Sequence, residues 1–391
     1  MTLHAKELKT MKTAGIIVEY NPLHHGHMHH LKKTREITGA DVIIAVMSGN
    51  VVQRGEFAIT DKFTRTEWAL EAGIDLVVEL PAFFTLQNAD LFAWAAVSIL
   101  DALGCETLVF GSESGDVHAL KAQSELMRTD TFNERINALM QEGHSYPSAN
   151  QIALETLSGK TFTQTPNDIL GVQYLNAIHD LRSPMEPRAI ERVESGYYEA
   201  YDQNRSIQSA TSVRQRLLEG KAIASSVPEH VYPSLQKGSL NTLSDYDPVI
   251  RYLLAIHSKE SLARIFSFEE GLESWLLRHR DATTHEALLK SMATRRYTQA
   301  RIKRSIMHMM LNTTKEEAPP FNVPYIRILG MRDAGQVYLN RIKHTLSVPL
   351  VSKVGRMRDP LLEFELKTSR LYAVFTDYSV YEREFDPVII L

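Results

Sequence analysis

The chain is poor in cysteine and has no long apolar segment. Cys105 is the only cysteine among 391 residues, so no internal disulfide framework can form, which fits a reducing cytosol. We expect Cys105 to pack at the end of an apolar helix. No run reaches the ~18 apolar residues of a membrane span, and the short apolar stretch after the N-terminal lysines ends at Glu19, which argues against a secretory signal. We therefore expect a cytoplasmic protein with no membrane partner.

The chain also lacks an overall positive charge. Its net charge of −4 alone argues mildly against nucleic acid as a partner. The charges are uneven, however, because residues 251–310 hold 11 Lys and Arg against 6 Asp and Glu, and residues 327–370 hold 9 against 4. Such segments can form a local phosphate-binding surface, although solvated helix faces explain them equally well. We expect no DNA partner.

Apolar runs alternate with amphipathic segments through the first half of the chain. Strands are expected at residues 14–18, 41–47, 74–80 and 107–110. The helices between them begin at residues that cap helices, such as Asn88, and end at Gly73 and Gly104. This alternation predicts an α/β fold with successive βαβ units, a mostly parallel sheet and helices on both of its faces.

The second half of the chain is mainly helical. A further strand at 188–193 and a helix from Ser209 precede a stretch at 221–246 where the pattern loosens. We therefore predict a Rossmann-like domain over residues 1–225 and a mainly helical C-terminal domain over residues 226–391. The latter contains a small β-α-β element over 325–352 and a last helix over 360–375. Pro349 restricts the second strand of that element to a sheet edge.

Three loops with polar or glycine-containing sequences follow three of the expected strands. They span residues 19–27, 48–56 and 111–116. Ligands of parallel α/β sheets bind beyond the carboxyl ends of the strands. We expect the three loops to meet at one site.

A histidine-rich segment joins the first strand to the first helix. It reads His24-His25-Gly26-His27-Met28-His29-His30. His24 and His27 lie three residues apart, so both point to one side of the first helical turn, where the helix N-terminus favours anions. Imidazoles there can donate hydrogen bonds to phosphoryl oxygens as charge builds. We favour a phosphate site over a metal site, because no regular set of Cys, His or Glu partners completes a metal shell.

A second segment of small hydroxyl residues starts a later helix. It reads Ser209-Ala210-Thr211-Ser212-Val213-Arg214. Taken alone, it is a good helix cap. Together with the distant histidine segment it becomes a candidate clamp for a triphosphate, with Arg214 reaching a phosphate oxygen.

The two segments together resemble the nucleotidyltransferase superfamily that includes class I aminoacyl-tRNA synthetases and coenzyme adenylyltransferases. More narrowly, the chain is similar to the bacterial tRNA(Met) cytidine acetate ligase family. The resemblance rests on the stretches from Val18 to His27, Val46-Met47-Ser48-Gly49-Asn50, Gln53-Arg54-Gly55-Glu56, Phe110-Gly111-Ser112-Glu113, Ser145-Tyr146-Pro147, Pro166-Asn167-Asp168-Ile169-Leu170-Gly171 and the segment from Ser209 to Arg214. It covers the N-terminal ~220 residues strongly.

The resemblance implies a ligase that converts ATP and acetate into acetyl-adenylate and pyrophosphate. The acetyl group then passes to N4 of the wobble cytidine, C34, of elongator tRNA(Met), giving N4-acetylcytidine and AMP. His24 and His27 would be the catalytic residues, acting on the phosphates. The residues implied in ATP binding are Ile17, Val18, Glu19, Tyr20, Asn21, Pro22, Leu23, His24, His25, Gly26, His27, Met28, His29, His30, Gly111, Asn167, Arg192, Ser212 and Arg214. Mg²⁺ is expected to bridge the phosphates.

Basic residues near the site are candidates for RNA contacts. They are Arg54, Arg296, Arg301 and Arg304. Tyr297, on the same helix face, either stacks a base or belongs to the core. Lys62 and Arg65 could face phosphate or tRNA, but we interpret them as exposed helix charges outside the site.

The chain departs from the family pattern at two places. Asn50 stands where we expect a histidine, which could alter a contact in the second loop. Residues 1–10 precede the point at which relatives begin, so that Met11 is an alternative start.

Two other functions fit the motifs. An adenylyltransferase for a small phosphorylated coenzyme precursor shares the sheet and both motifs, but needs no long basic C-terminal region. A non-catalytic tRNA-binding module would retain only a vestigial nucleotide site, and the intact motif residues speak against it.

Overall fold

The computed structural model describes residues 11–159, 165–192, 208–355 and 357–391, so residues 1–10 and Val193 of the expected fifth strand lie outside it. The strands are β1 (Thr13–Val18), β2 (Val42–Ser48), β3 (Val51–Val52), β4 (Glu56–Phe57), β5 (Leu76–Leu80), β6 (Thr107–Ser112), β7 (Glu186–Glu191), β8 (Ile326–Met331), β9 (Leu350–Val351) and β10 (Ile389–Ile390). All five strands expected in the first 225 residues are present, within a few residues of the expected bounds.

The helices of the first half are α1 (His25–Thr38), α2 (Lys62–Glu71), α3 (Ala82–Thr85), α4 (Ala89–Ala102), α5 (Val117–Met127), α6 (Asp130–Gln141), α7 (Tyr146–Ser158), α8 (Pro166–Asp180) and α9 (Ala210–Leu218). Those of the second half are α10 (Tyr232–Lys237), η1 (Leu243–Tyr246), α11 (Asp247–Ile256), α12 (Lys259–Arg264), α13 (Leu272–Arg278), α14 (His285–Met292), α15 (Gln299–Met310), α16 (Asp333–Ile342), α17 (Pro360–Val374), α18 (Ser379–Glu382) and η2 (Arg383–Phe385). In the described part of the chain, no helix is long and apolar enough to cross a membrane.

One eight-stranded sheet forms the centre of the molecule. Its order is β10-β8-β5-β2-β1-β6-β7, with β9 pairing with β8 beside this path. The neighbouring strands β5, β2, β1, β6 and β7 all pair in parallel, as the βαβ pattern predicts. The β8 strand runs antiparallel to β5. The mainly parallel α/β fold is therefore confirmed.

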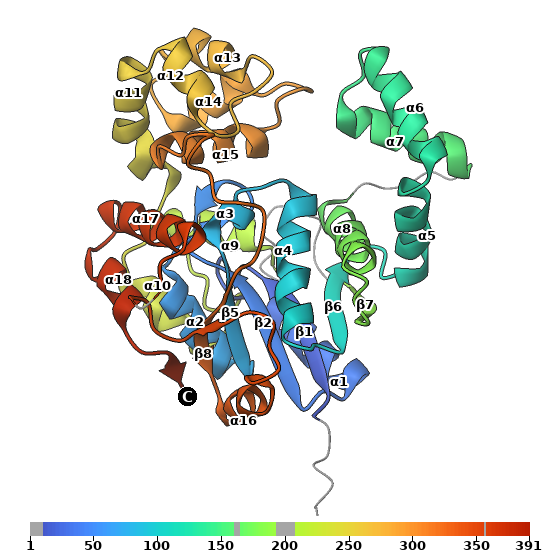
Figure 1. Cartoon of the computed structure of the whole chain (residues 1–391). Coiled ribbons are helices and arrows are strands. Elements are labelled where there is room, and N and C mark those ends of the chain that lie inside the picture. The colour runs from blue at the N-terminus through green and yellow to red at the C-terminus, as the bar shows by residue number, and fades with distance from the viewer. Residues whose placement is uncertain (1–10, 160–164, 193–207, 356) are drawn as a thin grey trace, which may run out of the picture.

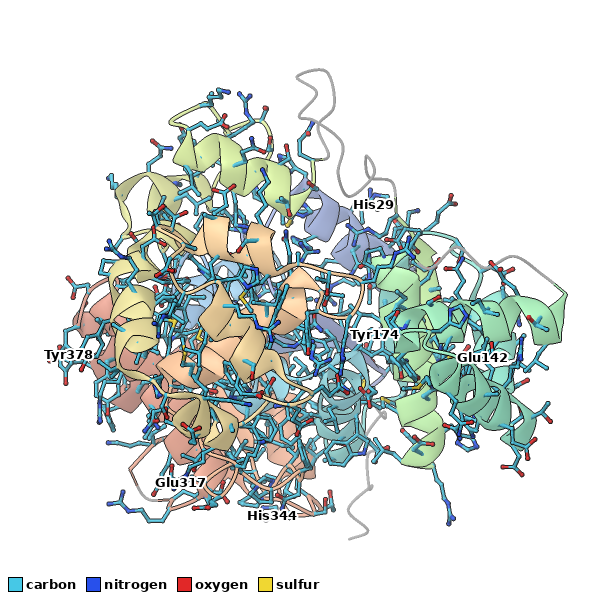
Figure 2. All side chains as sticks on the ribbon, turned by 90° about the horizontal axis from the view of Figure 1, so that it is seen from above. His29, Glu142, Tyr174, Glu317, His344 and Tyr378 are labelled. Carbon is cyan, nitrogen blue, oxygen red and sulfur yellow. The ribbon has the colours of Figure 1, made fainter. Side chains whose placement is uncertain are left out.

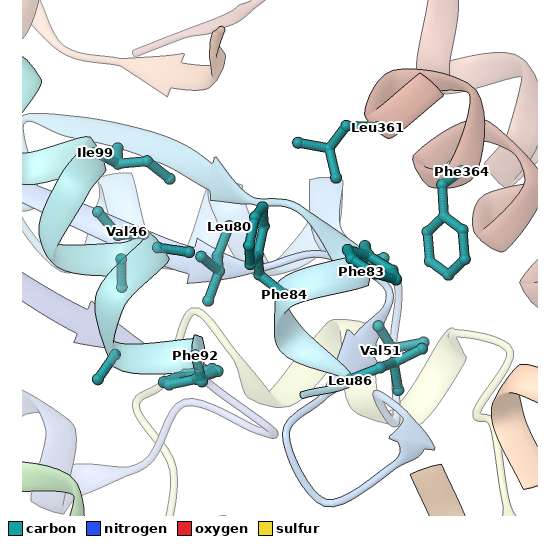
Figure 3. Close-up of a cluster of buried hydrophobic side chains, with 14 of the residues drawn as sticks. Val46, Val51, Leu80, Phe83, Phe84, Leu86, Phe92, Ile99, Leu361 and Phe364 are labelled. Atoms are coloured by element: carbon teal, nitrogen blue, oxygen red, sulfur yellow. The ribbon is translucent and has the colours of Figure 1, made fainter. Parts of the chain in front are cut away.

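Helices cover both faces of the sheet because its central strands are apolar on both sides. Along β2, Val42, Ile44 and Val46 belong to one core cluster, whereas Ile43 and Ala45 belong to the other. The first cluster packs under α3, α4 and α8, and Figure 3 shows part of it. The second packs under α1, α2 and α9. Cys105 is buried in the first cluster, just after α4, where we expected it to pack.

The C-terminal half contributes strands to the sheet, which the sequence did not predict. The expected small β-α-β element exists as β8, α16 and β9, and its last strand lies at an edge, immediately after Pro349. Its first strand nevertheless lies between β5 and β10 inside the main sheet. The sheet therefore crosses the domain boundary that we placed near residue 225, and that boundary stays a prediction.

Two helical groups stand away from the sheet. In Figure 1, α11–α15 gather at the top of the molecule, and α5–α7 reach out at the upper right. The α6–α7 pair has a small core of its own, built of residues such as Phe132, Ile136 and Leu154. The region of the sheet between these two groups of helices is where we expect the functional site.

Candidate active site

A cavity of about 650 Å³ opens beyond the carboxyl ends of β1, β6 and β7. The lining side chains come from nearly every segment that the motifs single out. They are Ile17, Val18, Glu19, Tyr20, Asn21, His24, Gly26, His27, His29, His30, Val52, Gln53, Arg54, Ala89, Phe92, Phe110, Gly111, Pro166, Asn167, Ile169, Leu170, Tyr174, Ile190, Glu191, Arg192, Ser209, Ala210, Thr211, Arg214, Thr298 and Ala300. Figure 2 labels His29 of α1 and Tyr174 of α8 on these walls.

The structure brings most of the predicted site residues together. Each of the three predicted loops supplies part of the lining. Five of the residues implied in ATP binding do not line the cavity, and these are Pro22, Leu23, His25, Met28 and Ser212. Leu23 is buried in the core below the loop, and Met28 packs against the same cluster. The ATP contacts themselves stay a prediction.

His24 and His27 are fixed by hydrogen bonds to the backbone at the start of α1 and by stacking of their rings. The His24 Nδ1 accepts a hydrogen bond from the Gly26 N–H at 3.0 Å, and the His27 Nδ1 accepts one from the His24 N–H at 3.2 Å. The two rings stack at a centroid distance of 3.8 Å. Because each Nδ1 accepts a hydrogen bond, each neutral ring must carry its proton on Nε2. Both histidines therefore present an Nε2–H donor.

The histidines are held neutral. Burial, reinforced by Arg192, lowers the pKa of His24 to about 3 and that of His30 to about 4. Burial also lowers the pKa of His27 well below its ordinary value. The buried His30 Nε2 makes no hydrogen bond with the residues that the structure describes. Neutral N–H donors can bind a phosphoryl oxygen in a defined direction without the repulsion that adjacent cationic rings would cause.

Glu113, which does not itself line the cavity, orients two predicted site residues. Its carboxylate accepts hydrogen bonds from the Asn167 Nδ2 at 2.6 Å and from the Thr165 Oγ1 at 2.8 Å. The Asn167 Oδ1 in turn accepts one from the Arg192 Nη1 at 3.1 Å. Glu113 thus aims the amide and the guanidinium into the cavity. The sequence gives no role to Glu113, because its partner Asn167 lies 54 residues further along the chain.

Arg214 lies on the cavity wall and also fixes the loop before α1. Its Nη1 donates to the Asn21 carbonyl oxygen at 2.7 Å, and its Nη2 lies 3.7 Å from the Glu56 Oε1. Ser209 caps α9 by accepting a hydrogen bond from the Ser212 N–H, so the interpretation of this segment as a helix cap is confirmed. Arg214 of the same segment also lines the cavity. The Ser212 side chain is buried outside the lining.

The interpretation of Lys62 and Arg65 as exposed charges is wrong, because both side chains are fully buried. Arg65 donates to the carbonyl oxygens of Glu19 at 2.6 Å and Ser48 at 3.0 Å, and also to those of Gly49 and Thr60. Buried guanidinium groups persist where their donors are satisfied in this way. Arg65 thereby holds the loop after β1 against the loop after β2, next to the cavity.

Asn50 belongs to the core and not to the cavity lining. Its Oδ1 accepts a hydrogen bond from the Lys62 N–H at 2.8 Å, and its Nδ2 donates to the Ser369 Oγ of α17 at 2.9 Å. Asn50, the residue that departs from the family pattern, therefore contributes to the contact between the second loop and α17.

The C-terminal half closes one side of the cavity. Thr298 and Ala300, at the start of α15, line it together with Arg54 of the β3–β4 hairpin. The Lys303 Nζ of α15 lies 2.6 Å from the Glu56 Oε2, and the Arg304 Nη1 donates to the Gln53 carbonyl oxygen at 3.3 Å. The hairpin and α15 therefore form one wall.

The four arginines predicted to bind RNA differ in exposure. Arg54 lines the cavity, whereas Arg296 is exposed and its Nε lies 3.7 Å from the Glu270 Oε2. Arg301 pairs with Glu270 at 3.1 Å, and Arg304 is largely enclosed against the hairpin. Tyr297 is buried and its hydroxyl donates to the Glu270 carbonyl oxygen at 2.6 Å, so the placement of that tyrosine in the core is confirmed. The RNA contacts stay a prediction.

Among residues 11–159, 165–192, 208–355 and 357–391, no group of three or more His, Cys, Asp or Glu side chains could hold a metal ion. The cavity instead offers imidazole N–H donors, the guanidinium groups of Arg54, Arg192 and Arg214, and side-chain amides such as that of Asn167 around one space. This set of donors suits a polyanion such as a nucleoside triphosphate.

The chain is similar to proteins of a known family. The profile of the HIGH nucleotidyl transferases matches residues 11–386. Relatives named tRNA(Met) cytidine acetate ligase are 39% identical in Geobacillus sp., covering 93% of this chain and 94% of the relative, and 37% identical in Bacillus subtilis, covering 93% and 92%. The relative of that name from Caldicellulosiruptor saccharolyticus is 39% identical and covers 95% and 96%.

Solved structures agree with these relatives. The apo crystal structure of Thermotoga maritima TmcAL has a TM-score of 0.89 at 29% identity, covering 97% of this chain and 100% of that one. The structure of the same protein bound with alpha-thio ATP has a TM-score of 0.85 at the same identity and coverage. Because the profile and the relatives extend over nearly all of its length, the chain belongs to the HIGH nucleotidyl transferases and, among them, to the tRNA(Met) cytidine acetate ligase family.

Proposed function

We propose that this chain is a cytoplasmic ATP-dependent ligase that acetylates N4 of the wobble cytidine, C34, of elongator tRNA(Met). Acetate attacks the α-phosphorus of ATP, pyrophosphate leaves, and acetyl-adenylate forms. N4 of the cytidine then attacks the acetyl carbonyl and AMP leaves. The observation that carries the proposal is the pair of neutral histidines whose Nε2–H groups are oriented at a helix N-terminus, in a cavity of a chain of this family.

The nucleotide would occupy the side of the cavity formed by α1, β6 and β7. The Nε2–H groups of His24 and His27 would donate to phosphoryl oxygens as pyrophosphate separates, since such donors act most strongly on charge that develops in the transition state. Arg192 and Arg214 would neutralise the remaining phosphate charge, and Asn167 would add a hydrogen bond. Gly111, at the end of β6, would let the nucleotide approach the sheet edge closely. Mg²⁺ would be held chiefly by the phosphates.

The tRNA would approach past α15 and the hairpin. Arg54 lines the cavity there, Arg296 is exposed just before α15, and Arg301 and Arg304 follow on α15. C34 must leave the anticodon stack to reach the cavity, as base-modifying enzymes require. A small phosphorylated coenzyme precursor would not need a wall contributed by residues 298–304, and a vestigial module would not need neutral, oriented histidines.

A radiolabel assay tests the proposed function. Purified protein is incubated with ATP, ¹⁴C-acetate and unmodified elongator tRNA(Met), and the nucleosides are separated. Label in N4-acetylcytidine at position 34 is the expected result. Pyrophosphate release only with a phosphorylated small molecule would favour the coenzyme enzyme instead, and binding of tRNA without turnover of any kind would favour the binding module.

A further inference from the structure

Acetyl transfer to a cytidine releases a proton that neither His24 nor His27 can accept. When N4 attacks the carbonyl carbon of acetyl-adenylate, the C–N bond forms and the C–O bond to the phosphate breaks. AMP leaves with the electron pair of the broken bond. One N4 proton must then go to a base, because the product is a neutral amide. His24 and His27 use their Nδ1 atoms inside α1 and present only N–H donors. The acceptor must therefore lie elsewhere.

Glu19 is an acidic residue on the wall next to the histidine motif. It follows β1 directly and lines the cavity, and its Oε1 accepts a hydrogen bond from the Gln53 N–H at 2.7 Å. This bond fixes the carboxylate toward the hairpin. No residue that the structure describes donates a hydrogen bond to its second oxygen, Oε2. One oxygen is thus anchored, and the other is available to a ligand.

Glu19 lies between the two halves of the cavity. In the sheet, β1 has β6 and β7 on one side and β2 on the other. The histidines of α1, Gly111 and Arg192 belong to the first side, where a nucleotide would bind. Gln53 and Thr298 belong to the second side, with the hairpin and α15. A base that enters past α15 would meet acetyl-adenylate next to Glu19.

The surroundings suit a base. Burial raises the pKa of the Glu19 carboxyl, although Arg54, Arg214 and Arg65 oppose the rise. A carboxylate with a raised pKa takes up a proton more readily at neutral pH. A carboxylate is also the side chain that accepts a hydrogen bond from N4 of cytosine, which the carbonyl O4 of uracil cannot supply.

Resting on the proposed function, we propose that Glu19 accepts the N4 proton. Its Oε2 receives a hydrogen bond from the amino group of the entering cytidine, orients the nitrogen toward the acetyl carbon, and takes the proton as the C–N bond forms. The proton then passes to solvent when AMP and the product leave. Glu19 is accordingly the catalytic residue of the second step, whereas the histidines serve the first.

The test separates the two steps in Glu19→Gln. Glutamine keeps an oxygen for the Gln53 N–H but cannot take up a proton. Acetate-dependent exchange of labelled pyrophosphate into ATP measures the first step, and transfer from isolated acetyl-adenylate to tRNA in a single turnover measures the second. We expect transfer to fall by about 10²–10³-fold, within the usual range for a lost general base, and exchange to fall by less than about tenfold. Glu142→Gln, an exposed change just after α6, is the matched control (Figure 2).

The outcomes separate the inference from the function. If both steps fall by the same factor, Glu19 only supports the cavity wall, and the inference is overturned. A fall in transfer of less than about threefold overturns it as well. If the unchanged protein performs neither step, the proposed function fails, whatever Glu19 does.

Discussion

At the scale of single residues, the ring nitrogen that carries the proton on each histidine decides which ligands the site can bind. The backbone N–H groups at the start of α1 occupy both Nδ1 atoms. The rings therefore cannot change tautomer without losing a hydrogen bond to the helix cap. Two donors are fixed before a ligand arrives, which reduces the reorganisation needed during the reaction.

His27→Ala tests this role. The change removes one oriented donor, and we expect acetyl transfer to fall by about 10²–10³-fold, as in other sites that lose a transition-state donor. Initial rates with saturating ATP and tRNA measure the effect. His144→Ala, an exposed histidine before α7, is the control. A loss below about threefold for His27→Ala would exclude the role.

Local motifs revealed most residues that line the cavity, but not the residues that hold them. The histidine segment, Arg192 and Arg214 lie in short patterns or follow recognisable strands. Glu113 and Arg65 act on partners brought close only by the fold, as Arg65 does on the carbonyl of Glu19, 46 residues earlier. Burial of Arg65 also had no sequence signal, because a charged residue on a helix is usually exposed.

At the scale of elements, the hairpin and α15 fit without space between them. A Cβ atom on Gly55 would lie 2.4 Å from the backbone nitrogen of Arg304, and Gly55 has a φ of +80°. Only glycine satisfies both conditions. The close approach lets Glu56 reach Lys303 and brings Thr298 to the cavity.

Gly55→Ala should therefore disturb α15 as well as the hairpin. We expect it to lower the free energy of unfolding by more than Gly39→Ala does, and to raise KM for tRNA. Gly39 has a φ of +61°, but a Cβ atom there would meet no other atom within 4 Å, so only the left-handed strain of about 1 kcal/mol applies. Urea unfolding and steady-state kinetics of both variants check this. Equal losses in stability in Gly55→Ala and Gly39→Ala would mean that the contact between the hairpin and α15 tolerates the added Cβ atom.

Element prediction succeeded where periodicity and caps agreed. The expected caps of α4 and α9 are Asn88 and Ser209, and each side chain accepts the capping hydrogen bond. The β3–β4 hairpin was missed because two strands of two residues have no periodicity.

At the scale of the whole molecule, a buried ionic cluster joins the two halves of the chain. The Lys62 Nζ lies 2.5 Å from the Glu79 Oε1, 3.1 Å from the Glu365 Oε1 and 2.8 Å from the Glu384 Oε1. Arg327 of β8 pairs with Glu79 at 3.1 Å and with Glu384 at 2.6 Å. Burial, together with Glu79, raises the pKa of Glu365.

Lys62→Met should lower the free energy of unfolding by about 3–5 kcal/mol, because it leaves buried carboxylates without their cation. Lys33→Met removes the exposed pair between Lys33 and Glu36, at 2.8 Å, and should cost less than about 1 kcal/mol. Urea unfolding at pH 7 compares the two. Similar losses in both variants would show that the cluster contributes no more than an exposed pair.

His308 makes the folded chain sensitive to acid. It is fully buried among Phe83, Phe266 and Phe364, and its ring nitrogens make no hydrogen bond within the described part of the chain. Burial lowers its pKa to about 3. Between this value and the ordinary value of about 6.5, only the unfolded chain binds the proton. Stability is therefore present above about pH 6.5 and is lost as the pH falls toward 3.

His308→Leu removes this contribution. Between pH 7 and pH 5, the free energy of unfolding of the variant should fall by about 2 kcal/mol less than that of the unchanged protein. Urea unfolding at the two pH values measures the difference. Parallel pH dependence in both proteins would mean that the ring is protonated in the folded state.

The sheet as a whole could not be predicted, although its parallel centre could. Each βαβ unit has a local pattern, and right-handed crossovers limit how such units connect. The pairing of β8 with β5 joins segments about 250 residues apart. Nothing in the apolar sequence of either strand specifies that partner, since any apolar strand of similar length could pair there.

This pairing has a consequence for the order of events on the ribosome. Synthesis proceeds from the N-terminus, and β5 emerges long before β8, which alone covers its outer side. Until then, a growing chain carries an apolar strand, Leu76–Leu80, with one row of unpaired backbone groups. Nascent chains are therefore exposed to association with one another, or with chaperones, for most of translation. Ribosomes stalled between residues 225 and 320 should hold chains that are captured by chaperones, whereas chains released after Leu391 should escape them.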